Sequence, residues 1–494
     1  LDLLYLFFLG VVSSFSLPPF NYFIINFLTF SLFFVFLFKK NSNYKFNFFL
    51  YGWVFGFGYF ISNIYWISIS LTFDENFKAL IPLSLILIPA FLAIFYGVVT
   101  YLFKILKFKK IVSSFFLFSL LFGIIEFLRG YILTGFPWNL IAFSFSNHPE
   151  LLSITSIIGT FGFNLFCISL FASPSIFILR DSRKDLIVCI LFLILPILFY
   201  MYGTFYKKKF LNLEATNNNF VIRVIGSNIN LDRFYQDVDP TLIINELIKI
   251  SEPDPSKKIF FLWPEGIIPD IYQNELVQYQ YLFNDHFNSN HIIGLGINKK
   301  SDDEYGPRFF NSFSIYDNKL NILNSYDKIN LVPFGEFLPL EQIFRKFGLK
   351  NLTNNYQSYS KGQKRDVIQV NWGSSGFKMI PLICYEIIYS GRLYSDQNFD
   401  YLINISEDGW FGKSIGPKQH FTHSIFRAIE SGKYLVRSAN NGTAAVVNPI
   451  GQIEGQVDFG KDGYVDFVKS RKFAPTVFSK FGNKIFIFII LLYI

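Results

Sequence analysis

Seven long apolar runs fill roughly the first two-fifths of this chain, and they restrict its fold more than any other feature of the sequence. A helix needs about 20 apolar residues to cross roughly 30 Å of hydrocarbon. The runs therefore predict membrane-spanning helices at residues 3–18, 22–38, 46–71, 80–103, 111–128, 154–179 and 186–205. An eighth run, 485–494, is too short to span alone, and we interpret it as part of a truncated last span.

The balance of charged and apolar residues divides the chain in two. Charged residues make up 16% of it, whereas a typical soluble domain carries about a quarter. The apolar excess ends near residue 217, beyond which short apolar strands, polar turns and mixed charges alternate. We therefore expect a transmembrane helical domain at 1–205, a linker at 206–219, a water-exposed domain at 220–472 and a C-terminal span at 473–494.

The positive charges indicate a membrane partner and an orientation. The net charge is +8, and the basic residues cluster at the ends of apolar runs, which favours acidic lipid head groups over nucleic acid. Lys and Arg collect in the second, fourth and sixth connections between runs, so these loops are expected in the cytoplasm and the domain at 220–472 outside. The three lysines at 207–209 disagree with this orientation, because they follow the seventh run on the outer side.

Polar residues in the apolar half form one group. Glu126 and Arg129 lie beside the turn Thr134-Gly-Phe-Pro-Trp138. Ionisable groups at membrane depth are costly and often functional, but a helix end also lets them reach the interface. Both interpretations stay open for Glu126, and we expect a functional role for the turn. Three tryptophans are expected to be interfacial anchors, namely Trp53, Trp66 and Trp138.

The region beyond residue 217 alternates strands with helices. Strands are expected at residues 220–226, 259–263, 291–297, 311–316, 377–384, 401–405, 436–438 and 443–447. Helices are expected at 241–250 and 420–431. Several strands are continuous apolar runs, which is typical of strands buried on both faces. The pattern predicts an α/β layered sandwich with site residues at its strand ends.

Cys384 lies where a buried apolar strand gives way to a polar turn. Strand packing fixes the backbone there while the side chain is exposed, which suits a nucleophile. A free cysteine is also often a plain core residue, so Cys384 alone does not decide the matter. Glu265 directly follows the apolar strand end 260–264, and Lys328 lies between Glu265 and Cys384 in the sequence. Glu, Lys and Cys in that order suggest acyl transfer through a thioester.

Each member of this trio has a chemical role that suits it. A thiol of ordinary pKa is mostly protonated near neutrality and needs a base or a nearby cation. Glu265 can take the proton and later return it to the leaving group. Lys328, if charged, is better suited to stabilising the oxyanion of a tetrahedral intermediate, together with the backbone N–H just after Cys384. Glu336 can hold the lysine in place, and Glu386 can be structural.

The residues around the trio resemble the nitrilase superfamily, whose members use Glu, Lys and Cys. The resemblance lies in Trp263-Pro-Glu265, in Lys328 with Leu331-Val-Pro-Phe-Gly-Glu336, and in Cys384-Tyr-Glu386. The chain is more similar still to the membrane branch of that superfamily, the apolipoprotein N-acyltransferases, through segments 134–138, 404–412, 427–430 and 437–440. The resemblance covers nearly the whole chain, and the combination of segments is highly specific. It departs from the family pattern at Glu407, where Asn is expected, and at Asn228, where Gln is commoner.

The resemblance implies an eight-span domain in the bacterial inner membrane that carries a periplasmic αββα nitrilase-like domain. Cys384 is then the nucleophile, Glu265 the base and Lys328 the oxyanion partner. Supporting positions fall on Glu336, Tyr385 and Glu386. The implied reaction moves a fatty acyl chain from a phospholipid, such as phosphatidylethanolamine, to the α-amine of a diacylglyceryl-cysteine apolipoprotein. No cofactor is expected, and the five histidines lack the spacing of metal ligands.

Both implied substrates are anchored in lipid, so a site over the outer leaflet avoids extracting acyl chains at about 0.8 kcal/mol per CH₂. Trp410, Phe411 and Trp138 are candidates for facing lipid, as is the segment 344–349. Core packing is an equally good interpretation of Trp410, Phe411 and that segment. The main alternative function is a membrane-tethered nitrilase-like amidase that hydrolyses small amides, and a non-enzymatic transporter or scaffold is the weakest alternative.

Overall fold

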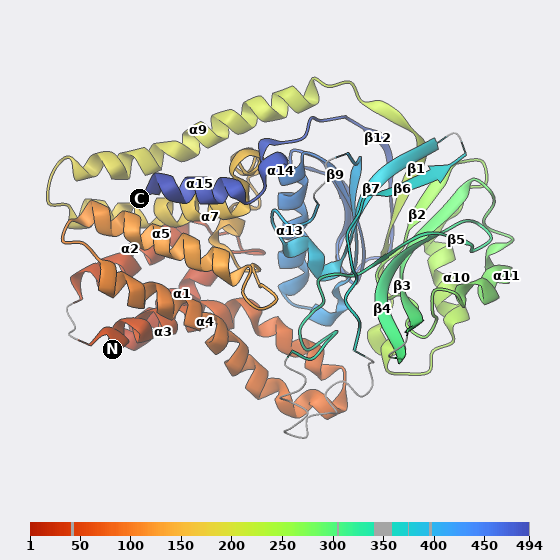
Figure 1. Cartoon of the computed structure of the whole chain (residues 1–494), viewed down its shortest axis with the longest axis horizontal. Coiled ribbons are helices and arrows are strands. Elements are labelled where there is room, and N and C mark those ends of the chain that lie inside the picture. Colours follow the sequence, from red (N-terminus) through yellow and green to blue (C-terminus); the bar gives the residue numbers. More distant parts are fainter. Residues whose placement is uncertain (41–43, 304–305, 340–357, 374, 395–397, 494) are drawn as a thin grey trace.

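The computed structural model describes residues 1–40, 44–303, 306–339, 358–373, 375–394 and 398–493. Figure 1 shows two halves side by side, a bundle of helices and a sheet-rich half. The chain leaves the bundle through the long helix α9 (Asp185–Leu211), forms the sheet-rich half, and returns through α14 (Val477–Phe481) to α15 (Lys484–Tyr493). The first and last helices of the chain therefore belong to the same half.

The helical half follows the predicted apolar runs. Its remaining helices are α1 (Asp2–Ser14), α2 (Ile24–Lys39), α3 (Lys45–Ile64), α4 (Ile81–Leu106), α5 (Ile111–Arg129), α6 (Pro149–Leu152), α7 (Thr155–Ala172) and α8 (Pro174–Leu179). Three 3₁₀ helices connect them, η1 (Tyr65–Thr72), η2 (Glu75–Leu80) and η3 (Ile141–Phe145). Within the described ranges, five helical stretches are long and apolar enough to cross a membrane: Lys45–Thr72, Glu75–Leu106, Ile111–Arg129, Thr155–Leu179 and Asp185–Leu211. Helices α1, α2 and α15 are apolar but shorter, so a total of about eight spans stays a prediction.

Glycines let the first helices of the bundle approach one another closely. A Cβ atom on Gly10 of α1 would lie 2.0 Å from the carbonyl oxygen of Phe55 on α3. A Cβ atom on Gly58 of α3 would lie 2.2 Å from the carbonyl oxygen of Phe7 on α1. Small residues at such crossings are typical of helices that associate in lipid, where dispersion contacts between backbones replace the hydrophobic effect.

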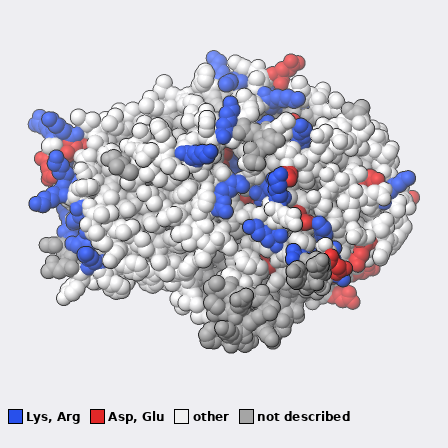
Figure 2. All heavy atoms as spheres, viewed as in Figure 1, with Lys and Arg blue, Asp and Glu red and all other residues white. Residues whose placement is uncertain are grey.

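The surface of the helical half carries a broad apolar band. Large exposed apolar side chains lie on α4 and α9, among them Leu83, Ile86, Ile190, Leu191 and Met201. Figure 2 shows a wide region without charged side chains across this half, with Lys and Arg gathered at its far end and again where the two halves meet. A band of this kind is suited to contact with hydrocarbon, and its charged borders are suited to head groups.

In the part of the chain that the structure describes, the strands form one continuous 12-stranded sheet. They are β1 (Thr216–Ser227), β2 (Ile259–Leu262), β3 (His291–Asp303), β4 (Gly306–Tyr316), β5 (Ile322–Asp327), β6 (Ile368–Trp372), β7 (Ser375–Ile383), β8 (Tyr401–Glu407), β9 (Tyr434–Asn440), β10 (Ala444–Val447), β11 (Ile453–Val457) and β12 (Gly463–Ser470). The main order is β5-β4-β3-β2-β1-β9-β8-β7-β6, and the central strands from β3 to β7 run parallel. Because the strands are parallel, their carboxyl ends meet at one edge.

The sheet folds so that its two parts share one core. That core takes Ile222 and Leu262 from the part around β1 and β2, and Met379 and Ile403 from the part around β7 and β8. Helices α10 (Pro240–Ser251) and α11 (Gln280–Phe283) cover the outer face of the first part. Helix α13 (Gly416–Ser431) covers the outer face of the second part. The predicted αββα sandwich is therefore confirmed.

Helix α13 joins the two halves. Apart from Lys418, all of its residues are buried. One face packs on the sheet, and the other packs on α7 of the helical half. Across that seam, the backbone N–H and the hydroxyl of Thr160 donate to Oε1 of Glu430 at 2.7 and 2.6 Å. The two halves therefore share a continuous packed interior.

Candidate active site

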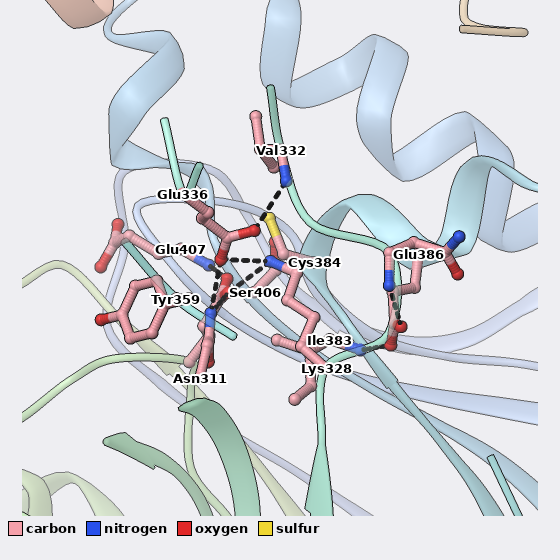
Figure 3. Close-up of polar contacts among 12 residues, drawn as sticks. Asn311, Lys328, Val332, Glu336, Tyr359, Ile383, Cys384, Glu386, Ser406 and Glu407 are labelled. Atoms are coloured by element: carbon pink, nitrogen blue, oxygen red, sulfur yellow. Dashed lines mark hydrogen bonds and ion pairs between the residues drawn. The ribbon is translucent and has the colours of Figure 1, made fainter. Parts of the chain in front are cut away.

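The strand ends bring the predicted trio together. Glu265 follows β2, Lys328 follows β5 directly, and Cys384 follows β7 as the first residue of the 3₁₀ helix η7 (Cys384–Ile388). Figure 3 shows the Lys328 ammonium directed toward Glu336, with the Cys384 sulfur beside it. Three segments that are far apart in the sequence thus build one polar cluster at the edge of the sheet.

The ammonium of Lys328 lies between two carboxylates. Its Nζ donates to Oε1 of Glu265 at 3.0 Å and to Oε1 of Glu336 at 2.9 Å. Burial alone would lower the pKa of Lys328, but the charges of Glu265 and Glu336 outweigh it and raise that pKa well above its usual value. Lys328 therefore stays charged near neutral pH, which excludes it as the base and suits it to binding a developing negative charge.

Backbone and amide donors fix both carboxylates. Nδ2 of Asn311 donates to Oε1 of Glu265 and to Oε1 of Glu336, each at 2.8 Å. Oε2 of Glu265 accepts from the N–H of Glu407 at 3.0 Å, and Oε2 of Glu336 accepts from the N–H of Val332 at 2.8 Å. All four carboxylate oxygens have donors, so the cluster is held in one geometry before any substrate arrives.

Cys384 lies on a strained turn. Its φ is 47°, in the left-handed region that a residue with a side chain rarely adopts. Strain of this kind is often found where a structure aims a functional side chain. Burial and the carboxylate of Glu265 raise the pKa of the thiol well above its usual value, with Lys328 opposing them. The thiol is therefore protonated at rest, and the sulfur needs a base to become a nucleophile.

Glu386 ties this turn to the loop that follows Lys328. Its side chain is fully buried. The carboxylate accepts from the Tyr326 hydroxyl at 2.8 Å and pairs with Arg365. It also accepts from three backbone N–H groups at 2.9, 2.9 and 3.1 Å, those of Ile383, Ile329 and Asn330. A single carboxylate thus fixes the cysteine turn relative to the lysine loop.

The cysteine turn is also bonded to the helical half. The hydroxyl of Tyr385 donates to the carbonyl of Gly135 at 2.9 Å, within the turn that the sequence singled out. The next carbonyl, that of Phe136, accepts from Arg129, which is paired with Glu126. Both members of that pair are about 1% exposed, so the interpretation that they reach the membrane interface is wrong. They support the turn that Tyr385 contacts.

Trp138 and Trp66 lie inside the seam between the halves. They are 3% and 4% exposed, and both indole N–H groups donate to Oε1 of Gln419 on α13, at 2.9 and 3.1 Å. The predictions that Trp138 faces lipid and that both rings are interfacial anchors are therefore wrong. An anchor ring needs a polar partner at a membrane surface, whereas here Gln419 supplies that partner inside the protein.

The other candidates for contact with lipid lie around the 3₁₀ helix η8 (Asp408–Phe411). Phe411 packs on Trp66 at 4.7 Å between ring centroids. Trp410 is partly buried against Phe234, at 4.9 Å. A role of Trp410 and Phe411 in lipid contact stays a prediction, and the segment 344–349 lies outside the described residues.

Several residues of the cluster escaped the sequence analysis. Asn311 is the clearest case, because it bonds both carboxylates from within β4. Glu407 stood out in the sequence only as a departure from the family pattern. Its side chain points away from the thiol and pairs with Arg233, while its backbone N–H bonds Glu265. The available signal for Glu407 was its position as a polar residue at the end of an apolar strand. The sequence does not reveal whether its side chain or its backbone N–H faces the site.

The sandwich, together with a cysteine beside a Glu–Lys pair at its strand ends, defines an enzyme of the carbon–nitrogen hydrolase class. A family model described as carbon-nitrogen hydrolase matches residues 284–467. A second one, described as apolipoprotein N-acyltransferase N-terminal domain, matches residues 9–173. Together the two matches fall on both halves of the molecule.

Relatives of known name cover nearly the whole chain. An apolipoprotein N-acyltransferase of Rhizobium etli is 30% identical over 92% of this chain and 88% of its own length. One of Brucella melitensis is 31% identical over 84% of this chain and 78% of its own length. Among solved structures, an amidase of Nesterenkonia sp. AN1 is 15% identical with a TM-score of 0.35, covering 52% of this chain and 92% of the amidase. The chain belongs to the apolipoprotein N-acyltransferase family.

Proposed function

We propose that this protein completes lipoprotein maturation by moving an acyl chain from a phospholipid to the amino terminus of a diacylated apolipoprotein, through a thioester on Cys384. Membership of the family supports the reaction. The observation that carries the mechanism is the Lys328 ammonium, held between two carboxylates beside the sulfur of Cys384. The phospholipid, of the phosphatidylethanolamine type, and the periplasmic face of the inner membrane are parts of the same proposal.

The first half-reaction forms the thioester. The carboxylate of Glu265 takes the proton from the Cys384 thiol while the sulfur attacks the acyl carbonyl carbon of the phospholipid. The carbonyl electron pair moves onto oxygen, where Lys328 and the backbone N–H of Tyr385 stabilise the charge. When the intermediate collapses, the C–O bond to glycerol breaks and the glycerol oxygen takes the proton from Glu265. The products are the acyl-enzyme and a lysophospholipid.

The second half-reaction releases the chain. The α-amine of the apolipoprotein cysteine attacks the thioester carbonyl carbon and gives a proton to Glu265. The C–S bond breaks, an amide forms, and the sulfur of Cys384 takes that proton back. Both substrates reach the site in the plane of a bilayer, which restricts their motion and raises their effective concentration.

The test uses the full chain in detergent micelles with phosphatidylethanolamine labelled in its acyl chains. We expect label on the protein that hydroxylamine removes, and no such label on Cys384→Ser. A diacylated lipopeptide should then discharge the label into an amide. Hydroxylamine-labile label on Cys384→Ser contradicts the thioester. Discharge only to free fatty acid favours the alternative, an amidase that passes its acyl group to water.

A further inference from the structure

Three exposed cations lie at the border between the two halves. Arg392 follows the cysteine turn in the sheet-rich half, and Lys480 and Lys484 lie four residues apart at the junction of α14 and α15. Among the residues that the structure describes, none of the three forms an ion pair. The reaction described above assigns no role to them, so their charges call for a partner outside the chain.

Asn483 holds the segments that carry these cations together. Its Nδ2 donates to the hydroxyl of Tyr131 at 2.6 Å and to the carbonyl of Ser390 at 2.8 Å. Tyr131 follows α5, and Ser390 lies two residues before Arg392. Asn483 itself directly precedes Lys484. The cations therefore belong to one surface, to which both halves contribute.

The guanidinium of Arg392 is fixed in place although the side chain is exposed. Its Cζ lies 4.5 Å from the ring centroid of Tyr131 and 4.9 Å from that of Tyr389. Nη1 donates to the carbonyl of Gly130 at 3.1 Å, and the remaining N–H groups have no partner among the described residues. A guanidinium stacked on rings presents its free N–H groups in a fixed fork, which suits the oxygens of a phosphate.

Large apolar side chains are exposed beside the cations. Ile132 and Leu133 follow Tyr131, and the side chain of Leu133 is 79% exposed. Its φ is 60°, so the turn holds an apolar side chain outward in a left-handed conformation that such residues rarely adopt. Phe481, next to Lys480, is 57% exposed. Exposed apolar surface bordered by polar groups is typical of sites that contact proteins or membranes.

The apolar surface continues along α15. Ile487 and Phe488 are exposed in the first turn after Lys484, whereas Phe486 packs inward on Phe127 of α5 at 4.8 Å between ring centroids. Cations therefore lie at the beginning of α15 and apolar side chains beyond them, toward the apolar band of the helical half. A phospholipid has the same order of parts, because its anionic phosphate lies at the bilayer surface and its acyl chains lie below.

We propose that Arg392, Lys480 and Lys484 bind the phosphate of a glycerophospholipid in the leaflet next to the sheet-rich half, with its acyl chains against α15 and the side chains of Leu133 and Phe481. The lipid bridges the two halves, since Arg392 belongs to one and α15 to the other. It is bound without reacting, so the inference does not depend on the proposed function.

The test uses the full chain in neutral detergent micelles and an ether-linked phosphatidylglycerol with a diazirine in one chain. A lipid without an ester carbonyl cannot acylate Cys384. After irradiation, mass spectrometry should find cross-links on residues 131–133 or 481–493, and unlabelled ether-linked phosphatidylglycerol should remove them by competition. The matching dialkylglycerol, which lacks the phosphate, should need about 10- to 100-fold higher concentrations, because each cation near a head group contributes about fivefold to affinity.

Charge-removing variants test the three cations directly. Arg392→Gln and Lys484→Gln should each weaken competition by phosphatidylglycerol about fivefold, and the double variant by about 25-fold. A matched control is the double variant Lys109→Gln with Lys110→Gln, which removes two exposed cations at the opposite end of α5. It should stay within about twofold of wild type, because these lysines lie far from the proposed phosphate site.

Three results would overturn the proposal. Equal competition by dialkylglycerol and phosphatidylglycerol shows that apolar contact alone explains the binding. Wild-type competition in the Arg392→Gln and Lys484→Gln double variant shows that the cations do not bind the phosphate, and an equal loss in the Lys109 and Lys110 control shows only a general effect of net charge. Failure of ester-linked phosphatidylethanolamine to acylate the protein would instead contradict the proposed function and leave this site standing.

Discussion

Replacing Glu265 by Gln tests its proposed role as the base most directly, because the change removes the charge of the side chain and keeps its shape. The Coulomb attraction between Lys328 and Glu265 at 3.0 Å is about 6 kcal/mol for an effective dielectric constant of about 20. Glu336, at 2.9 Å from the same Nζ, supplies an attraction of equal size. In Glu265→Gln the ammonium therefore keeps a carboxylate partner and its proton. The proposed oxyanion partner therefore survives while the proposed base is lost.

The expected results follow from these contacts. Acyl-enzyme formation should slow by about 10²- to 10⁴-fold, the usual contribution of a positioned base. The fold should lose about 1 to 3 kcal/mol, because Oε2 accepts from the N–H of Glu407 and an amide must either turn a donor toward it or give up Asn311. Labelled phosphatidylethanolamine measures the first quantity and thermal unfolding the second.

A matched control is Glu407→Gln, a side-chain change at the residue whose backbone N–H bonds Glu265. Its buried side chain pairs with Arg233 and not with the site. Breaking that pair should cost about 3 to 5 kcal/mol of stability, more than Glu265→Gln, yet leave acylation within about tenfold of wild type. Acylation of Glu265→Gln within threefold of wild type, on a folded protein, would refute the assignment of the base.

Other expectations concern the thiol, its surroundings and the seam. Because burial raises the pKa of Cys384, the thiol should react slowly with iodoacetamide at pH 7, and the rate of alkylation should keep rising through pH 9. A rate that reaches a plateau below pH 8 contradicts the raised pKa. Although burial opposes it, the charge of Arg437 and the hydrogen bonds from His420 and Ser406 hold the pKa of Asp408 below its usual value. Its carboxylate therefore adds stability above about pH 4 that is lost as the pH falls further. Asp408→Asn should cost about 3 to 5 kcal/mol at pH 7, and an unchanged Tm would be inconsistent with the buried pair. Tyr385→Phe leaves the Gly135 carbonyl without its 2.9 Å donor and should cost about 1 to 3 kcal/mol, which an unfolding midpoint equal to wild type would rule out.

The sequence predicted Glu265 and Cys384 because each follows a strand that appears in the sequence as an apolar run. Lys328 follows β5, which was missed, so it was predicted from its chemistry and from the family resemblance and not from a strand pattern. Glu265 and Cys384 come directly after continuous apolar segments, and the carboxyl ends of parallel strands meet at one edge. The predicted strand that included Cys384 is wrong by one residue, since β7 ends at Ile383. That residue matters, because the left-handed turn begins there.

Pairing between distant segments explains what the sequence did not predict. Asn311 reaches both carboxylates because β4 pairs with β5 so that Ser312 lies opposite Asp327, next to Lys328. Strands β5, β6, β11 and β12 were missed because they are partly exposed and mix polar with apolar residues, so periodicity does not distinguish them from turns. The partner of Trp138 is Gln419, 281 positions away, and no local rule connects them.

Helix α13 has consequences for how the molecule is made. Helix α13 has a single exposed residue, Lys418, and packs on both halves, so it offers no boundary at which the chain can be divided. A sheet-rich half produced by itself would expose Gln419, Phe426 and the Glu430 carboxylate and should aggregate. The ribosome releases the bundle first, so the later residues meet an inserted surface that serves as a template for docking. Helices α14 and α15 follow the sheet in the sequence and pack on α7 of the bundle, so the sheet-rich half is connected to the bundle at both of its ends.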